Sequence, residues 1–136
     1  MKMIRFTWKY DVGSEKMKFE NIDWADSRLE KIDIEYDIAT LLIWNDTLQE
    51  MLSVRCIGLA GITNLCIWDD LHIMKAEIDC VNEKDDEFIS KLYSAYDKEF
   101  DYGGRKLTGL ISLNIELSNY ICFSIYCLDV NIEAVK

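Results

Sequence analysis

Apolar and polar residues alternate in several stretches of this chain, and this alternation restricts its fold more than any other feature. In residues 72–80, Lys75, Glu77 and Asp79 separate apolar or weakly polar side chains. The same two-residue period occurs in residues 4–10, 32–36, 111–117 and 121–127. Because this period places successive side chains on opposite faces of an extended chain, each stretch predicts a strand with one buried face.

Other strands are expected between these stretches. Residues 38–44 are apolar at nearly every position, which is typical of a central strand covered on both faces. Residues 51–58 and 130–135 are expected to form two more strands. Gly58 and Gly61 indicate a bulge or a turn after the first of these.

The N-terminal residues predict a hairpin with a basic outer face. A loop at 11–14 pairs Trp8 with Met17 and Phe6 with Phe19. This register places all the basic residues of both strands on the face opposite these apolar side chains.

A second hairpin is expected near the C-terminus. A three-residue loop at 118–120 places Leu117 opposite Ile121, whereas a two-residue turn would mix apolar and polar faces. We therefore predict the three-residue loop, with Asn119 or Tyr120 near the left-handed region of backbone conformation.

Residues 85–100 predict a helix, because their apolar side chains recur at a helical spacing and form one wide stripe. Gly103 and Gly104 would end it. The predicted fold class is therefore α+β, with about seven or eight strands in a curved or sandwiched, mostly antiparallel sheet and the helix packed on it. We expect residues 1–136 to form a single domain.

The charge balance limits the partners that this protein can bind. The chain has 25 acidic and 15 basic residues, a net charge of -10 and a pI near 4.5. DNA, RNA and anionic membranes would be repelled, whereas a basic protein would be attracted. Lys2, Arg5 and Lys9 interrupt any signal-peptide core, and the apolar stretch 38–44 is too short to span a membrane. We therefore expect a cytoplasmic protein.

No catalytic, metal-binding or cofactor-binding group is predicted. His72 is the only histidine, and its spacing from the nearest cysteines does not match a structural zinc site. The cysteines are odd in number and irregularly spaced, as expected of reduced thiols in apolar surroundings. They are Cys56, Cys66, Cys80, Cys122 and Cys127.

The pattern Trp-x-Asp occurs three times, in segments 24–26, 44–46 and 68–70. In one interpretation, each tryptophan closes the edge of the core and each aspartate begins a turn. In the other, the segments form an acidic rim with aromatic anchors for a partner, because tryptophan is enriched at binding hot spots and carboxylates attract Lys and Arg.

In the segments 43–46, 65–70 and 100–105, and in its size and acidity, the chain resembles the small bacterial immunity proteins of polymorphic and contact-dependent toxin systems. The resemblance implies a cytoplasmic protein-binding inhibitor that masks a basic toxin, in some cases a nuclease, and that is not an enzyme. The predicted partner-binding residues are Trp44, Asp46, Trp68, Asp69, Asp70, Asp97, Glu99 and Asp101.

Two other functions stay open from the sequence. One is a structural or assembly module that forms a homo-oligomer through an exposed strand. The other is a small-ligand-binding or hydrolytic domain, which requires a deep pocket with converging polar groups.

Overall fold

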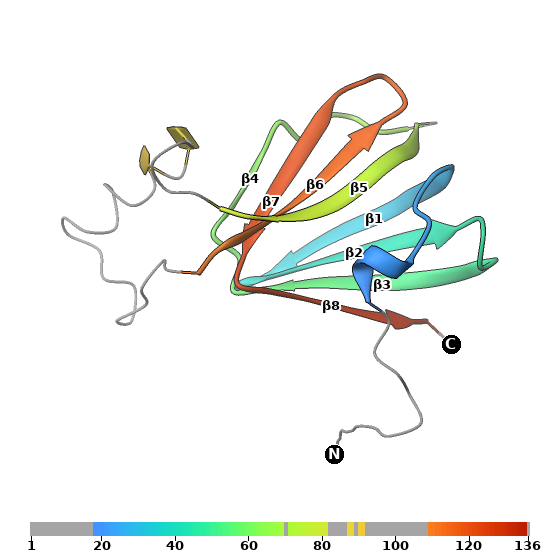
Figure 1. Ribbon diagram of the computed structural model, residues 1–136, viewed down its shortest axis with the longest axis horizontal. Helices are drawn as coiled ribbons and strands as arrows, with labels where there is room; N and C mark the ends of the chain where they lie inside the picture. The colour runs from blue at the N-terminus through green and yellow to red at the C-terminus, as the bar shows by residue number, and fades with distance from the viewer. Residues whose placement is uncertain (1–17, 70, 82–86, 89, 92–108, 136) are drawn as a thin grey trace, which may run out of the picture.

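The computed structural model describes residues 18–69, 71–81, 87–88, 90–91 and 109–135 (Figure 1). The chain forms one eight-stranded antiparallel sheet with the strand order β4-β7-β6-β5-β1-β2-β3-β8. A short 3-10 turn, η2, precedes the strands at Phe19–Asn21. The strands are β1 (Ser27–Glu35), β2 (Ile38–Asn45), β3 (Glu50–Ile57), β4 (Gly61–Thr63), β5 (His72–Cys80), β6 (Ile111–Leu117), β7 (Cys122–Cys127) and β8 (Asp129–Ala134).

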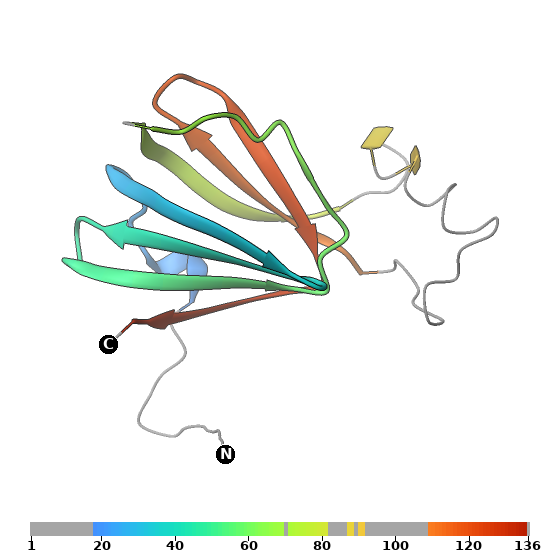
Figure 2. The ribbon, with the colours of Figure 1, turned by 180° about the vertical axis from the view of Figure 1, so that it is seen from behind.

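The sheet folds back on itself at a corner between residues 58 and 128. After Gly58 the chain passes from β3 into β4, and at Leu128 it passes from β7 into β8. β3 pairs with β8 and β4 pairs with β7, so the two bent segments run antiparallel on both sides of the corner. Figures 1 and 2 show the two halves of the sheet, β1-β2-β3-β8 and β4-β7-β6-β5, spreading apart from this corner.

The core lies between the two halves. Each half contributes the alternate side chains of its inner face, and none of the members named here exceeds 4% exposure. Away from the corner, the described halves are joined where Ser27 and Arg28 of β1 pair with Ile73 and His72 of β5, and where the Asp26 N–H donates to the Ile73 carbonyl oxygen at 2.9 Å. The core residues are Leu29, Ala39, Leu41, Ile43, Leu52, Val54 and Cys56 from one half, and Ile73, Leu113, Ile115, Leu117, Phe123, Ile125 and Cys127 from the other.

The segment before β1 also belongs to the core. Phe19 and Trp24 are both buried, and their rings stack with centroids 4.7 Å apart. The Trp24 Nε1–H donates a hydrogen bond to the Phe19 carbonyl oxygen at 3.1 Å. Phe19 was predicted on the second strand of an N-terminal hairpin, but it lies in η2; the rest of that hairpin, residues 4–17, lies outside the described residues.

The predicted α+β class is wrong, because the described chain is an antiparallel β structure without a main helix on the sheet. The predicted helix at 85–100 lies mostly outside the described residues; only 87–88 and 90–91 are described, and these are helical. The physical reason for the error is the corner. Since the two halves of the sheet bury each other's apolar faces, the core does not require a helical layer.

Several predicted strands are confirmed. β5 has the predicted bounds 72–80, and in the β6–β7 hairpin the Leu117 N–H donates to the Ile121 carbonyl oxygen at 3.0 Å. Tyr120 has the expected left-handed backbone, with φ 68°. Residues 38–44 are central, but they are fully covered on one face only: Ile38, Thr40, Leu42 and Trp44 are half-buried.

Candidate protein-binding surface

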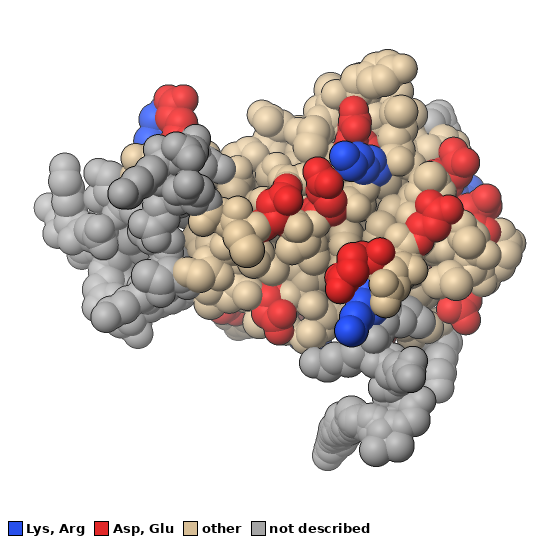
Figure 3. Space-filling model, viewed as in Figure 1, with Lys and Arg blue, Asp and Glu red and all other residues tan. Residues whose placement is uncertain are grey.

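Acidic side chains dominate the surface that the structure describes. Among these residues, sixteen are Asp or Glu and six are Lys or Arg. Four of the six cations form exposed ion pairs, the shortest being Lys31 Nζ to Asp33 Oδ2 at 3.1 Å. Twelve of the described carboxylates therefore lack an ion-pair partner within this part of the chain. Figure 3 shows that acidic groups outnumber basic ones on the face of the molecule that it presents.

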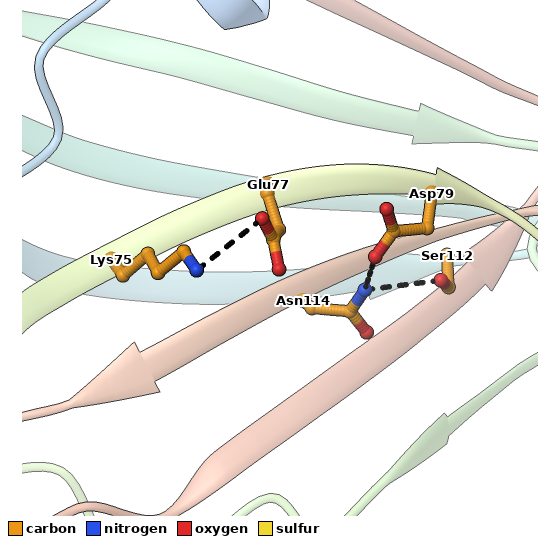
Figure 4. Close-up of polar contacts among 5 residues, drawn as sticks. All are labelled: Lys75, Glu77, Asp79, Ser112 and Asn114. Atoms are coloured by element: carbon orange, nitrogen blue, oxygen red, sulfur yellow. Dashed lines mark hydrogen bonds and ion pairs between the residues drawn. The ribbon is translucent and has the colours of Figure 1, made fainter.

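One organised polar surface lies on the outer face of β5 and β6. Strand register places Lys75, Glu77 and Asp79 of β5 directly beside Glu116, Asn114 and Ser112 of β6. We call these six residues the β5–β6 face. They bring three carboxylates and one ammonium group together, and the Lys75 Nζ lies 3.6 Å from Glu77 Oε2 (Figure 4).

Hydrogen bonds fix the centre of the β5–β6 face. The Asn114 Nδ2 donates to Asp79 Oδ2 at 3.0 Å and to Ser112 Oγ at 3.2 Å, as Figure 4 shows. On its other side, the Ser124 hydroxyl of β7 donates to Asn114 Oδ1 at 2.6 Å. The orientation of the Asp79 carboxylate is thus set before any partner arrives, which lowers the entropy lost on binding.

The thiol of Cys122 reports the negative potential beside this face. Cys122 lies on β7 directly opposite Glu116. Its pKa is raised first by burial and then by the charges of Glu116 and Glu77, although Lys75 acts in the opposite direction. A raised pKa lowers the thiolate fraction at neutral pH, so this thiol is not an activated nucleophile.

The first predicted Trp-Asp pair lies at the end of β2. Trp44 is half-buried on the outer face of the sheet, between Met51 of β3 and Arg28 of β1 in register. Asp46 is exposed in the turn after β2, where its side chain accepts a hydrogen bond from the Gln49 side chain at 3.4 Å. Asp46 therefore has a role in the turn as well as an accessible carboxylate.

The second pair lies in the connection from β4 to β5. Trp68 is half-buried against the core and Asp69 is exposed. Because Arg28 pairs with both Trp44 and His72, the two Trp-Asp segments lie toward the same end of the sheet, on either side of Arg28. The other predicted residues, Asp70, Asp97, Glu99 and Asp101, lie outside the described residues.

The structure adds Glu77, Asp79 and Glu116, which were not among the predicted binding residues. Each occupies the polar position of an alternating strand, and this was visible in the sequence. Their convergence depends on the pairing of β5 with β6, which are far apart in the chain. Strand alternation gives the face of each residue but not its neighbour on the next strand.

Two of the cysteines are buried together near the corner. Cys56 of β3 and Cys127 of β7 are fully buried free thiols. A hydrogen bond with Cys127, together with burial, raises the pKa of Cys56. Cys56 therefore stays a protonated, apolar core residue.

Metal-binding groups and membrane-spanning helices are absent from the described residues. In this part of the chain, no three His, Cys, Asp or Glu side chains are grouped so that they could hold a metal ion. None of its helices has the length and apolarity required to cross a bilayer. An open hollow of about 510 Å³ is lined by residues 65–69.

A scan of protein-family models gives no match to this chain, and a search of curated proteins also gives none.

Proposed function

We propose that this protein is a protein-binding inhibitor of the immunity type, which masks a basic toxin with its acidic surface. The observation that carries the proposal is the β5–β6 face, where Glu77, Asp79 and Glu116 share one surface with a single lysine, Lys75. Such a surface is complementary in charge to Lys and Arg side chains. A protein that binds a polyanion, such as a nuclease, presents these side chains at its own binding site.

The charge of the whole molecule supports the same proposal. A net charge of -10 accelerates the encounter with a basic partner and keeps nucleic acids away. The exposed ion pairs, such as Lys31 with Asp33, contribute little to folding stability. Most of the surface charge is therefore available for recognition rather than required by the fold.

The test is capture of the tagged full chain's partner from a lysate of its source organism, followed by affinity measurement with the purified pair. The test variant is Glu77→Gln/Asp79→Asn/Glu116→Gln, which removes three charges and keeps the shape of each side chain. We expect binding at low salt to weaken about tenfold or more. The loss should shrink at about 0.5 M salt, where the Debye length is only a few ångströms.

A matched control removes the same number of charges elsewhere. Glu50→Gln/Asp129→Asn/Glu133→Gln changes three exposed residues of β3 and β8, away from the β5–β6 face in the strand order. Binding should change much less in this control. Equal effects of the two triple variants would show that only net charge matters, and failure to capture any basic protein would contradict the proposed function.

A further inference from the structure

The longest uncharged segment of the described chain begins after Arg55 and ends before Asp69. Residues 56–68 contain no Asp, Glu, Lys or Arg, in a chain of which 29% of the residues are charged. The first part of the segment completes β3 and forms the corner, so its composition follows from burial. Burial does not explain the second part, which lies at the surface.

The second part of this segment begins at an edge of the described sheet. Among the described residues, β4 is the terminal strand and pairs with β7 alone, while Phe88 lies close to Gly61 at the start of β4. Beyond it, Asn64 turns the chain with a φ of 62°, and residues 65–69 continue outside any strand. Within the described structure, the backbone of Leu65, Cys66 and Ile67 makes no hydrogen bond.

Residues 65–69, which we call the Ile67 segment, alternate between the core and solvent. Cys66 and Trp68 pack against the core, whereas Leu65 is 42% exposed and Ile67 is 83% exposed. These five residues also line the hollow of about 510 Å³. The Ile67 segment is thus packed against the core through Cys66 and Trp68, and it exposes apolar side chains and unpaired backbone groups to solvent.

The opposite edge of the sheet is different. β8 has two exposed carboxylates, those of Asp129 and Glu133. Charged side chains on an edge strand commonly prevent strand addition. β4 and the Ile67 segment lack a charge until Asp69. Among the described residues, the β4 side therefore has no charged side chain before Asp69 that would oppose strand addition.

We propose that β4 and the Ile67 segment bind an extended segment of a basic partner protein by strand addition. Backbone groups would provide the hydrogen bonds, and Leu65 and Ile67 would receive alternate apolar side chains of the partner. The inference rests on the proposed function and specifies where part of that partner docks. A second copy of this chain is disfavoured because it brings another charge of -10, whereas a basic segment is attracted by Asp69 and the acidic body.

The probe is a synthetic peptide of the same length as residues 61–69, with lysine and valine alternating, added to the full ¹⁵N-labelled chain. We expect saturable shifts of the amide signals of residues 61–69 and smaller changes at β8. The same peptide with alternate backbone nitrogens methylated should not bind, because it lacks the N–H donors that strand addition requires. Absence of saturable shifts at 61–69, or equal binding of the methylated peptide, would overturn the proposal.

A pair of matched variants separates the edge from general electrostatics. Ile67→Lys places a charge on the edge, and Ile34→Lys makes the same substitution at another exposed isoleucine, on β1. Peptide affinity should fall about tenfold in the first variant and much less in the second. Equal losses of peptide affinity in the two variants would overturn the proposal. So would self-association of the free protein, seen as a mass that rises with concentration, if Ile67→Lys abolishes it and Ile34→Lys does not, because the occupant would then be a second copy. Because the peptide replaces the natural partner, these results do not depend on the partner-capture experiment.

Discussion

Gly58→Ala tests the most restrictive point of the fold, the corner at which β3 passes into β4. Gly58 has a φ of 73°, which L-residues other than glycine adopt only with strain. A Cβ atom at this position would lie 2.7 Å from Leu128 Cδ1 and 2.9 Å from Leu128 Cβ. Since the Leu128 Cβ is fixed to the backbone, a change of rotamer cannot relieve the whole overlap.

The expected magnitude is the sum of two costs. The left-handed backbone costs an alanine about 1–2 kcal/mol, and overpacking against Leu128 adds about 1–3 kcal/mol. Gly58→Ala should therefore lower the free energy of unfolding by about 2–5 kcal/mol. Gly109→Ala isolates the first cost, because Gly109 has a φ of 76° and its added Cβ would meet nothing within 4 Å.

Urea denaturation of the two variants and the wild type measures both costs. Gly58→Ala should be at least about 1 kcal/mol less stable than Gly109→Ala. Adding Leu128→Ala to Gly58→Ala should recover only part of that difference, because it removes the contacts with Cγ and Cδ1 but leaves the contact with Cβ. Equal destabilisation by the two glycine variants would refute the close-contact argument for the corner.

Three further predictions concern the periphery. Gly61→Ala should displace Phe88, because the Phe88 Cζ lies 2.6 Å from the position of the added Cβ. NMR should show loss of the contact between the Phe88 and Tyr126 rings, and the free energy of unfolding should fall by only about 1 kcal/mol. Tyr36→Asn should raise the melting temperature, equivalent to about 1 kcal/mol, because Tyr36 is 93% exposed at a φ of 56° that asparagine tolerates better; a lower melting temperature would contradict this. Alkylation of Cys122 should require a higher pH than alkylation of an ordinary cysteine, and Glu116→Gln should accelerate the reaction at pH 8 by lowering the pKa of the thiol. Peptide mapping of the labelled protein measures the rate, and an unchanged rate would contradict the charge effect.

The strands could be predicted where one face is buried and the other is exposed to solvent. In β5 the predicted bounds match those observed, but the predicted buried face is wrong in its first half, because a bulge between Ile73 and Lys75 buries Ile73 and leaves Met74 44% exposed. The β6–β7 loop could be predicted, since only one loop length keeps Leu117 and Ile121 on one face. Alternation alone does not ensure burial: Ile34 alternates with Asp33 and Glu35, yet it lies near the end of β1 and is 56% exposed.

The layer that covers the sheet could not be predicted from local patterns. The apolar stripe of residues 85–100 indicates a helix that buries it on a sheet face, and a sheet with an apolar face requires a cover. The corner at Gly58 and Leu128 provides that cover by turning one half of the sheet onto the other. A single glycine in the sequence marks a bend without revealing how far the chain turns or which strand it meets next.

The proposed binding surfaces also depend partly on the sequence and partly on the tertiary structure. Sequence alone determined the negative charge, the strand faces and the uncharged segment 56–68, because each is a property of composition or local periodicity. Only the tertiary structure placed Glu77 and Asp79 on one face with Glu116 and left the Ile67 segment outside the sheet. These arrangements depend on strand order, which is decided by long-range burial of apolar faces rather than by any local signal in the chain.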